Sequence, residues 1–497
     1  MDVYKNLNLT EPVIEKIIIS DSFRKGEKGN SYKTKTDDNS RKIYTFLFAQ
    51  LSECLSKASQ DYHSYNHNDP LRIEDGRKVR SYSTDLIFAS RTLQTRTGGA
   101  SGVLILSNCC FYTSAESFRN ILHINCFLVF ELLPLVIMPL RNEIVVVTGS
   151  SGFLGQHIVK LLQEEDTECG EIRLFDRRPY VNNLGHTETK PMKHYVADVR
   201  DRDALTKALT GADCVIHVAG VVDVSPFPNV DDMVSTNVEG TRNVIETCIQ
   251  KNVSRLVFAS TTDMVCGSEH IFYGTESTTP IPTTFMIGKY GETKCQAEKL
   301  VLEASGKLLA NGERTLRTIS LRPVPLYGEE DKHFIYKVLK YIKKNNSYYL
   351  RVRSLDERLQ ICYVGNAAWA HIRAKSRLAK DETVSGEAFF ITDDTPIIDI
   401  HEHIRLYAEA RHFKVSGFVF PYWLAWIILS LIYLLVRVIN VFVRFDVDIP
   451  NVNELNYSCS TFFFNRSKST LRLDYQPMYN PERANDLAMQ YYKSVEL

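Results

Sequence analysis

Tyr290 and Lys294 lie four residues apart at the start of an amphipathic stretch, and this pair could carry out acid/base chemistry. Side chains at positions i and i+4 project from one face of a helix. A free phenol has a pKa of about 10, and a neighbouring ammonium group favours the phenolate and lowers that value. A phenolate can take the hydroxyl proton of an alcohol while hydride leaves for a cofactor. The spacing therefore predicts that Lys294 lowers the pKa of Tyr290, the acid/base group.

A glycine-rich turn predicts a cradle for the pyrophosphate of a dinucleotide. The β-branched run Glu143–Val147 is typical of a buried parallel strand and leads into Gly149, Gly152 and Gly155. These glycines permit, in order, a tight turn, close approach of a pyrophosphate and packing of helix on strand. A helix over about 153–165 then presents its amino terminus to the phosphates. The predicted cofactor contacts here are Gly149, Gly152, Phe153, Leu154 and Gly155.

The residues after the next predicted strand favour NAD as the cofactor. Asp176 follows the strand Glu171–Phe175, where a carboxylate can bind the 2′-hydroxyl of the NAD ribose. Arg177 and Arg178 leave NADP open, because either guanidinium could bind the 2′-phosphate of that cofactor.

The elements that must position these residues alternate along the chain. Apolar strands are separated by periodic helical segments such as 232–249, and this order predicts an α/β fold with a doubly wound parallel (Rossmann) sheet and right-handed crossovers. The predicted strands are Glu143–Val147, Glu171–Phe175, Tyr195–Ala197, Cys214–Val218, Leu256–Ala259 and Thr318–Leu321.

A hydroxyl group at the end of the strand Leu256–Ala259 is the expected third member of the catalytic set. Ser260, Thr261 and Thr262 are all available there. Such a hydroxyl would hydrogen-bond the substrate oxygen and hold it against the phenol.

Beyond these motifs, the chain from about Arg141 to its end resembles the 3β-hydroxysteroid dehydrogenase/Δ5-4 isomerases, which are extended short-chain dehydrogenase/reductases. Further segments that are similar to the family's signatures, in the same order, are Asn237–Thr241 (NVEGT), Leu321–Pro323 with Leu326–Glu329 (LRP, LYGE), Tyr363–Asn366 with Ala368–His371 (YVGN, AWAH) and Leu473–Tyr479 (LDYQPMY).

The resemblance implies roles for particular residues. Aligning Ala259–Gly267 with the family's strand-end motif implies that Thr262 stands at the position of the catalytic serine, with an added methyl group and a stiffer side chain. Tyr290 and Lys294 match the family's own tyrosine and lysine. As the acid after the third strand does in related proteins, Asp198 is expected to contact the adenine.

The resemblance also implies an isomerase step. Asp393–Pro396 is similar to the family's D-D-T-P segment, in which a carboxylate moves a proton from C4 to C6 of a 3-keto-5-ene steroid. The residues themselves leave open a second interpretation of Asp393 and Asp394, as caps of a turn before Pro396.

An uncharged segment near the carboxyl terminus predicts contact with a membrane. Gly417–Val436 is long enough to cross a hydrocarbon core of about 30 Å, and basic residues flank both of its ends. An in-plane helix, a hairpin dipping into one leaflet and burial inside the soluble domain are the alternatives. The family carries an apolar segment at this point, which implies the endoplasmic reticulum membrane or a mitochondrial membrane as the location.

Composition excludes several classes of protein. The 59 basic and 59 acidic residues cancel, so no overall positive field favours nucleic acid. Eleven cysteines without C-x-x-C pairs suit reduced thiols, and no metal site is expected.

The expected division of the chain has five parts. Residues 1–140 form a poorly ordered extension or an artefact of the gene model, 141–325 the NAD-binding domain, 326–415 the substrate-binding region, 416–443 the membrane segment and 444–497 a tail.

The expected function is NAD-dependent oxidation of the 3β-hydroxyl of a steroid or sterol at a membrane, with Δ5-4 isomerisation as a second step and a homodimer as the assembly that the resemblance suggests. One alternative is oxidation of another lipid alcohol, including a sterol-4-carboxylate with loss of CO₂. Another is a non-catalytic cofactor-binding membrane protein, which only the threonine at 262 favours.

Overall fold

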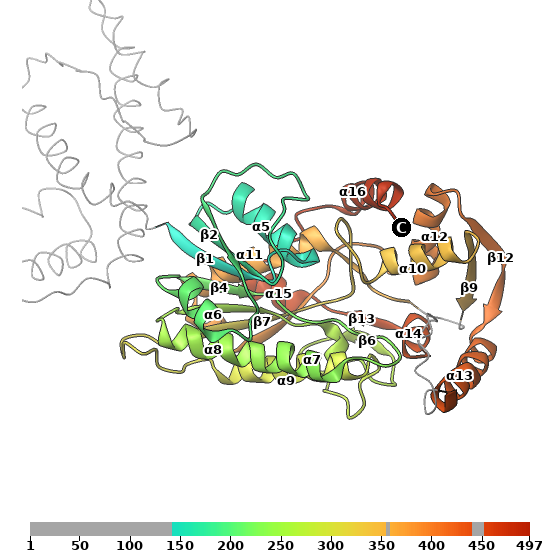
Figure 1. Cartoon of the computed structure of the whole chain (residues 1–497), viewed down its shortest axis with the longest axis horizontal. Helices are drawn as coiled ribbons and strands as arrows, with labels where there is room; N and C mark the ends of the chain where they lie inside the picture. The colour runs from blue at the N-terminus through green and yellow to red at the C-terminus, as the bar shows by residue number, and fades with distance from the viewer. Residues whose placement is uncertain (1–141, 354–357, 440–451) are drawn as a thin grey trace, which may run out of the picture. The chain divides into compact units, whose positions relative to one another are not determined.

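The computed structural model describes residues 142–353, 358–439 and 452–497, and its main feature is a parallel sheet of seven strands. The predicted doubly wound α/β fold is confirmed (Figure 1). From one edge to the other the strands are β11 (Glu387–Ile391), β7 (Arg317–Pro323), β5 (Arg255–Ala259), β4 (Cys214–His217), β1 (Glu143–Thr148), β2 (Cys169–Asp176) and β3 (Met192–Val196).

Alternating side chains of each strand fill two cores, one on each face of the sheet. In β1, Val145 and Val147 join one cluster of buried residues and Val146 joins the other, as the period of two along a strand requires. Residues of α5 (Phe153–Glu164) and α11 (Val364–Lys380) belong to the first cluster. Residues of α6 (Arg202–Leu209), α8 (Gly240–Gln250) and α9 (Lys289–Glu303) belong to the second.

The predicted helix over 232–249 is present but is not uniform. It comprises α7 (Val230–Met233), a π-helical stretch η1 (Val234–Glu239) and α8. Asn237 lies in the π-helical stretch, where the wider turn changes the direction of its side chain relative to a regular helix.

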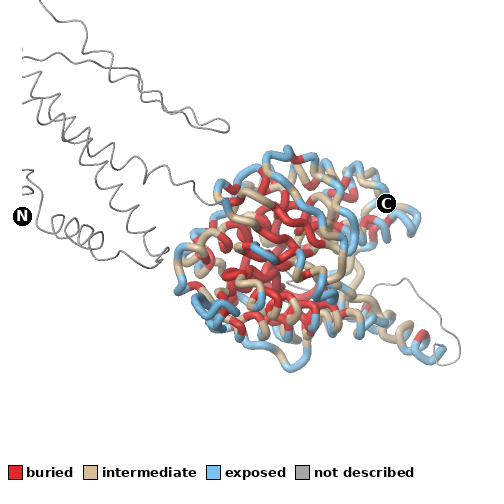
Figure 2. Tube along the Cα trace, turned by 60° about the vertical axis from the view of Figure 1, so that its left-hand side comes forward, coloured by how far each residue is buried: buried red, intermediate tan, exposed pale blue. Residues whose placement is uncertain are grey.

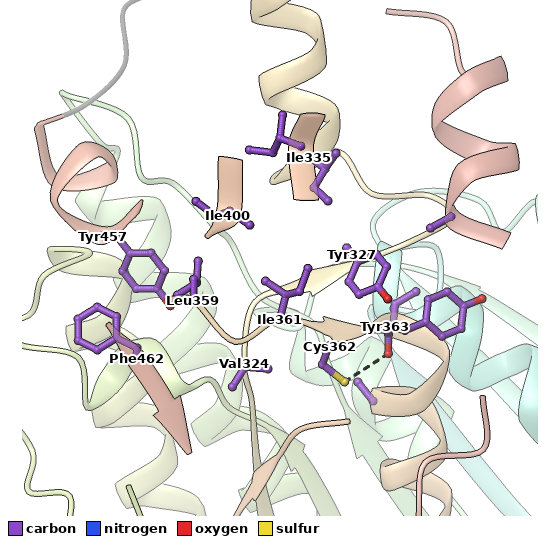
Figure 3. Close-up of a cluster of buried hydrophobic side chains, with 14 of the residues drawn as sticks. Val324, Tyr327, Ile335, Leu359, Ile361, Cys362, Tyr363, Ile400, Tyr457 and Phe462 are labelled. Carbon is purple, nitrogen blue, oxygen red and sulfur yellow. Dashed lines mark hydrogen bonds between the residues drawn. The ribbon is translucent and has the colours of Figure 1, made fainter. Parts of the chain in front are cut away.

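A third cluster of buried residues joins the end of the sheet to the carboxyl-terminal part of the chain. Tyr327, Ile361, Tyr363 and Phe462 are among its members, and Figure 3 shows them packed together. Its elements include β8 (Leu326–Tyr327), α10 (Ile335–Lys344), β10 (Cys362–Tyr363), α12 (Ile400–Ala410), α14 (Val452–Ser458), β13 (Phe462–Phe464) and α16 (Pro481–Ser494). Also present are η2 (Thr262–Met264), β6 (Ile271–Gly274), β9 (Tyr348–Arg353), η3 (Glu382–Val384), β12 (Lys414–Pro421) and α15 (Ser467–Leu473).

The structure differs from the expected division at residue 325. The chain leaves the sheet after β7 and returns to it in β11, so part of the range 326–415 belongs to the sheet and to the helix layer on it. Residues 452–497 also fold back onto the rest, because β13 pairs with β6. The predictions for residues 1–140 concern a part of the chain outside the described residues.

The apolar segment forms α13 (Tyr422–Ile439), which is long and apolar enough to cross a membrane. The helix begins five residues later than the expected start at Gly417, because residues up to Pro421 pair with β9 as strand β12. Most of its residues are exposed or half-buried, in contrast to the buried sheet (Figure 2). The alternative of burial inside the soluble domain is therefore wrong.

Candidate active site

The glycine-rich turn lies between β1 and β4, where the order of strands reverses. Gly149 has a φ of +73°, and a Cβ atom there would lie 2.7 Å from the backbone nitrogen of Ala219, which follows β4. A Cβ on Gly155 would lie 2.0 Å from the carbonyl oxygen of Gly149. The third glycine thus packs the helix against the turn itself. Ligands of open α/β sheets bind at this reversal.

The amino terminus of α5 is suited to an anion. Gly152 stands at the cap position, no side chain caps the helix, and its first turn has no acidic residue. The first amides of a helix have no acceptor within the helix, and their dipoles point toward any anion placed there. Phe153 and Leu154 supply the first of these amides. The cradle and the helix end fit a pyrophosphate.

Asp176 lies at the end of β2 and is tied to the glycine-rich turn. Its carboxylate accepts hydrogen bonds from the amides of Ser151, at 3.0 Å, and Arg178, at 2.9 Å. The guanidinium of Arg178 donates to the carbonyl oxygen of Ser151 at 3.0 Å. A carboxylate therefore lies next to the cradle, which suits a ribose hydroxyl and opposes a 2′-phosphate.

Asp198 follows β3 and is paired with arginines. Arg200 donates to both carboxylate oxygens, at 3.0 and 2.8 Å, and Arg177 lies 3.9 Å away. Partial burial acts to raise the pKa of Asp198, but the hydrogen bonds and charge of Arg200 outweigh it and hold that pKa below its ordinary value. The carboxylate is thus ionised beside the end of the sheet.

Tyr290 and Lys294 lie in the first turns of α9. Tyr290 is partly buried, and its hydroxyl has no hydrogen-bond partner among the described residues. Lys294 is buried; its Nζ donates to the carbonyl oxygen of Ala259 at 2.5 Å and lies 4.2 Å from the centre of the Phe258 ring. Burial lowers the pKa of Lys294 to about 7, against the opposing charge of Glu298. The lysine is held at the end of β5.

The prediction that Lys294 lowers the pKa of Tyr290 is wrong for the chain without a cofactor, because the surrounding residues raise this pKa. Burial raises the pKa of the phenol, and the carboxyl group of Asp263 raises it further. Lys294 is not among the groups that shift it. Its ammonium group is directed to the Ala259 carbonyl and loses charge near neutral pH, so it cannot offset the burial of the phenol.

Thr262 begins η2, and two residues separate it from the end of β5. The side chain is completely buried, and its hydroxyl donates to the carbonyl oxygen of Pro323 at 3.3 Å. Ser260 and Thr261 have shorter-range partners: Ser260 donates to the sulfur of Met264, and Thr261 accepts from the amide of Asp263. Of the three hydroxyls, only that of Thr262 reaches across to the end of β7.

No pattern in the sequence indicated the pair formed by Asp263 and Tyr457. The hydroxyl of Tyr457, on α14, donates to Asp263 at 2.9 Å, and its ring packs against Phe462 at the edge of the buried cluster (Figure 3). A Cβ on Gly291 would lie 3.0 Å from the carbonyl oxygen of Asp263, which shows how tightly η2 packs against α9. Tyr457 therefore stabilises η2, the turn that carries Thr262. This turn packs against the start of α9, where Tyr290 lies.

A second missed group anchors α9 to the sheet. Glu298, one helical turn after Lys294, accepts a hydrogen bond from Ser320 at 2.7 Å and is bound by two nitrogens of Arg322. All three side chains are buried and belong to α9 and β7. The i+4 spacing of Glu298 from Lys294, together with Arg322 in the LRP segment, was a signal that could have found this pair.

Asn237 connects the loop after β4 to α9. Its side-chain oxygen accepts from the amide of Val221 at 2.7 Å, and its nitrogen donates to Val221 at 3.0 Å and to Thr293 at 3.1 Å. Thr293 lies between the tyrosine and the lysine on α9. The π-helical stretch thus directs this amide toward the helix that carries Tyr290 and Lys294.

Both acidic residues of the D-D-T-P segment have partners within the chain. Asp393 accepts hydrogen bonds from the amide of Tyr363 and the side chain of Asn366, each at 2.9 Å, and from the amide of Thr395 at 3.0 Å. Asp394 is 55% exposed and pairs with Arg466 at 2.6 Å. The hydrogen bond from Thr395 corresponds to the turn-capping interpretation of Asp393, whereas the other bonds join the segment to distant parts of the chain.

Gly155→Ala is expected to weaken NAD⁺ binding roughly tenfold to a hundredfold. The added methyl group would meet the backbone of Gly149; overpacking costs about 1–3 kcal/mol, and about 1.4 kcal/mol is tenfold in affinity. Titration of NADH fluorescence measures the effect. Gly417→Ala is the control, because no atom lies within 4 Å of its added Cβ. Equal affinity in the two variants would contradict the cradle.

Comparisons with known proteins identify relatives and a fold. The model of the 3-beta hydroxysteroid dehydrogenase/isomerase family matches residues 146–418. 3 beta-hydroxysteroid dehydrogenase type 7 from Mus musculus is 29% identical over 360 residues, 70% of this chain and 95% of the relative. The enzyme of the same name from Homo sapiens is 30% identical over 351 residues, 69% of this chain and 93% of the relative. The solved structure of MoeE5 in complex with UDP-glucuronic acid and NAD has a TM-score of 0.51 and 17% identity, covers 70% of this chain and 98% of that one, and shows a likeness of fold.

Proposed function

The chain belongs to the 3-beta hydroxysteroid dehydrogenase/isomerase family, and from this premise we propose that it oxidises the 3β-hydroxyl of a steroid or sterol with NAD as hydride acceptor. The observation that carries the proposal is the glycine cradle at the strand reversal, combined with Tyr290 and Lys294 on α9. The two mammalian relatives, named as 3 beta-hydroxysteroid dehydrogenases, support the substrate class.

The cofactor would be held by groups already described. The turn Gly149–Gly155 and the first amides of α5 would hold the pyrophosphate, Asp176 the adenosine ribose, and Asp198 the side of the adenine. The carboxylate of Asp176 favours NAD, whereas the exposed Arg178 keeps NADP as an alternative. When bound, the nicotinamide accepts hydride and carries, in its oxidised form, a positive charge that favours a phenolate nearby.

Proton transfer would take place at the hydroxyl of Tyr290. The phenolate would take the proton of the 3β-hydroxyl, and the side chain of Thr262 would hold the substrate oxygen. Lys294 would bind the nicotinamide ribose once its Nζ turns from the Ala259 carbonyl. Because the chain alone raises the pKa of Tyr290, the ionised form depends on charge that arrives with the cofactor.

The test is to incubate the detergent-solubilised protein with NAD⁺ and a 3β-hydroxy-5-ene steroid. Formation of NADH measures dehydrogenation, and ultraviolet absorption of the conjugated enone measures isomerisation. NADH with enone would support both steps, and NADH alone would restrict the proposal to the first. With NAD⁺ binding intact, absence of both overturns the proposed substrate. Release of CO₂ from a sterol-4-carboxylate would then favour the decarboxylating alternative.

Isomerisation would need a carboxyl group that can carry a proton between two carbon atoms of the steroid. The family match supports it, but Asp393 already accepts three hydrogen bonds and Asp394 is paired at the surface. If enone is formed, Asp393→Asn and Asp394→Asn assign the step, because only the variant that lacks the proton carrier would keep NADH formation and lose the enone.

We also propose that α13 attaches the enzyme to a membrane, where lipid-soluble steroids concentrate. Trp423, Leu431 and Leu434 are each more than 60% exposed on this helix, and large exposed apolar surfaces mark binding sites. Flotation of the protein with phospholipid vesicles tests the attachment. The location remains a prediction: the endoplasmic reticulum membrane, with a mitochondrial membrane as its alternative. Assembly as a homodimer also remains a prediction.

Asp263→Asn is expected to shift the pH profile of steroid oxidation to lower pH. The carboxyl group of Asp263 raises the pKa of Tyr290, so removing its charge lowers that pKa and lets the phenolate form in more acidic solution. The measurement is kcat against pH. Tyr407→Phe is the control for disturbance of the neighbouring buried cluster, because it removes the buried hydroxyl that donates to Asn485 and changes no charge. A shift to higher pH in Asp263→Asn would contradict the assignment.

A further inference from the structure

Both ends of α13 are attached to the same folded body. Before the helix, β12 pairs with β9, with Phe420 opposite Val352 and Pro421 opposite Arg353. After it, α14 places the hydroxyl of Tyr457 on Asp263. The next strand, β13, pairs with β6. The chain therefore enters and leaves α13 on one side of any membrane that the helix contacts.

The connection after the helix is too short for a return through the bilayer. Residues 440–451, twelve in number, separate α13 from α14 and include Arg444, Asp446 and Asp448. A spanning helix needs about 17–25 predominantly apolar residues. An extended return would leave backbone polar groups unpaired in hydrocarbon, at several kcal/mol each. A single crossing by α13 is therefore incompatible with the fold on either side of it.

One stripe of α13 packs against the protein over almost the whole helix. Tyr422 donates to Asn456 at 3.0 Å, Ala425 and Leu429 pack with Leu455 of α14, and the ring of Tyr433 stacks on that of Phe227, with centroids 6.4 Å apart. The stripe is Tyr422, Ala425, Leu429, Tyr433 and Val436. If α13 stood upright in the bilayer, it would lose its contacts with the body of the enzyme beyond its first turn.

The opposite stripe is apolar from end to end and exposed. Its members are Trp423, Ile427, Leu431, Leu434 and Val438, which are 42–62% exposed. Arg437, the one charged residue of the helix, lies at the flank between the two stripes. An upright helix would also carry the ion pair of Lys337 with Glu454, 2.7 Å apart beside α13, toward hydrocarbon, where charged groups are costly.

We propose that α13 lies in the plane of a single leaflet, so that the enzyme is monotopic and both ends of the helix face the same aqueous compartment. This inference rests on the proposed membrane attachment. The occupant of the exposed stripe is the acyl region of one leaflet, into which in-plane helices sink by about 5–10 Å. The packed stripe keeps the body of the enzyme, including Phe227 in the loop after β4, on the lipid surface.

The depth of single tryptophans along the exposed stripe tests the orientation. The chain has three tryptophans, at 369, 423 and 426. Trp369→Phe with Trp426→Phe leaves the native Trp423. Adding Trp423→Phe together with Leu431→Trp, or with Val438→Trp, moves the probe along the helix. Each full-length variant is bound to phosphatidylcholine vesicles that carry bromine at different acyl positions, and quenching reports its depth.

In the plane of a leaflet, the three probes are quenched at one shallow depth. A probe at 431 near the bilayer centre, with both ends shallow, would overturn the inference, as would vesicle-bound protein without quenching at any position. Failure of every variant and of the wild type to float with vesicles would overturn the attachment and the inference with it. NADH formation, measured on the same samples, reports separately on the proposed reaction and on folding.

Leu431→Glu is expected to reduce the vesicle-bound fraction at least tenfold, since a charged group replaces apolar surface at the middle of the exposed stripe; about 1.4 kcal/mol is sufficient for that change. Leu471→Glu is the control, because Leu471 is 79% exposed on α15, outside the stripe. Soluble turnover should stay unchanged in both variants. Equal flotation of the two would contradict the assignment of the stripe to lipid.

Discussion

Tyr290→Phe is expected to lower kcat for steroid oxidation by about 10²–10⁴-fold, the usual contribution of a positioned acid or base. The variant loses only the hydroxyl, which has no hydrogen-bond partner among the described residues, so folding and NAD⁺ affinity should remain unchanged. Steady-state formation of NADH measures the loss, and cofactor titration checks binding. The effect is large because the variant has no hydroxyl at position 290 to take the proton of the substrate.

The matched control is Tyr341→Phe, which removes the hydroxyl of a 41% exposed tyrosine on α10 and should leave turnover unchanged. If Tyr290→Phe keeps more than about a tenth of the activity, the acid/base assignment is wrong. A loss of NAD⁺ binding in parallel with kcat would instead indicate a structural role for the phenol.

Lys375→Met is expected to lower the free energy of unfolding by about 3–5 kcal/mol, the usual cost of breaking a buried ion pair by removing one partner. The Nζ atom of Lys375, on α11, lies 2.8 Å from Glu143, 2.7 Å from Asp166 and 3.7 Å from Glu168. Its side chain is completely buried, so methionine would leave the buried carboxylate of Asp166 without its cation, while Glu143 keeps Arg255 and Glu168 keeps Lys380. Urea denaturation, followed by circular dichroism, measures the loss.

Lys380→Met is the control from the same helix. Lys380 also pairs with Glu168, at 2.9 Å, but it is 53% exposed, and exposed pairs contribute about 0–1 kcal/mol. A loss of under about 1 kcal/mol in Lys375→Met as well would show that the buried carboxylates can be satisfied without the lysine.

Much of the fold could be predicted because its signals are local. Each of the six predicted strands overlaps a strand of the sheet, since β-branched runs next to helical patterns indicate parallel strands wherever they occur. The seventh strand, β11, was missed. It lies far along the chain, in the range expected to bind substrate. Its five residues form a strand of the sheet because they pair with β7. The return of the chain to the sheet after residue 325 could not be predicted for the same reason, because it depends on which distant segments pair.

The candidate site divides in the same way. The four-residue spacing of Tyr290 and Lys294 is a local property, whereas the electrostatic environment of the phenol depends on distant groups. The carboxyl group of Asp263 comes from η2 and is bound by Tyr457 from α14, and burial and this carboxyl group both raise the pKa of the phenol. No spacing along the chain indicates these contacts.

By itself, then, the sequence determined the class of fold, the glycine cradle, the helix face shared by the acid/base pair and the presence of an apolar helix near the carboxyl terminus. The tertiary structure alone decided the direction of the Tyr290 pKa shift, the hydrogen-bond partners of Asp393 and which face of α13 packs on the folded body. Periodicity specifies which side chains share a face of one element, because the backbone geometry of each element is fixed. It cannot specify what lies opposite that face, because burial, charge and the sidedness of a helix arise from segments that meet only when the chain folds back.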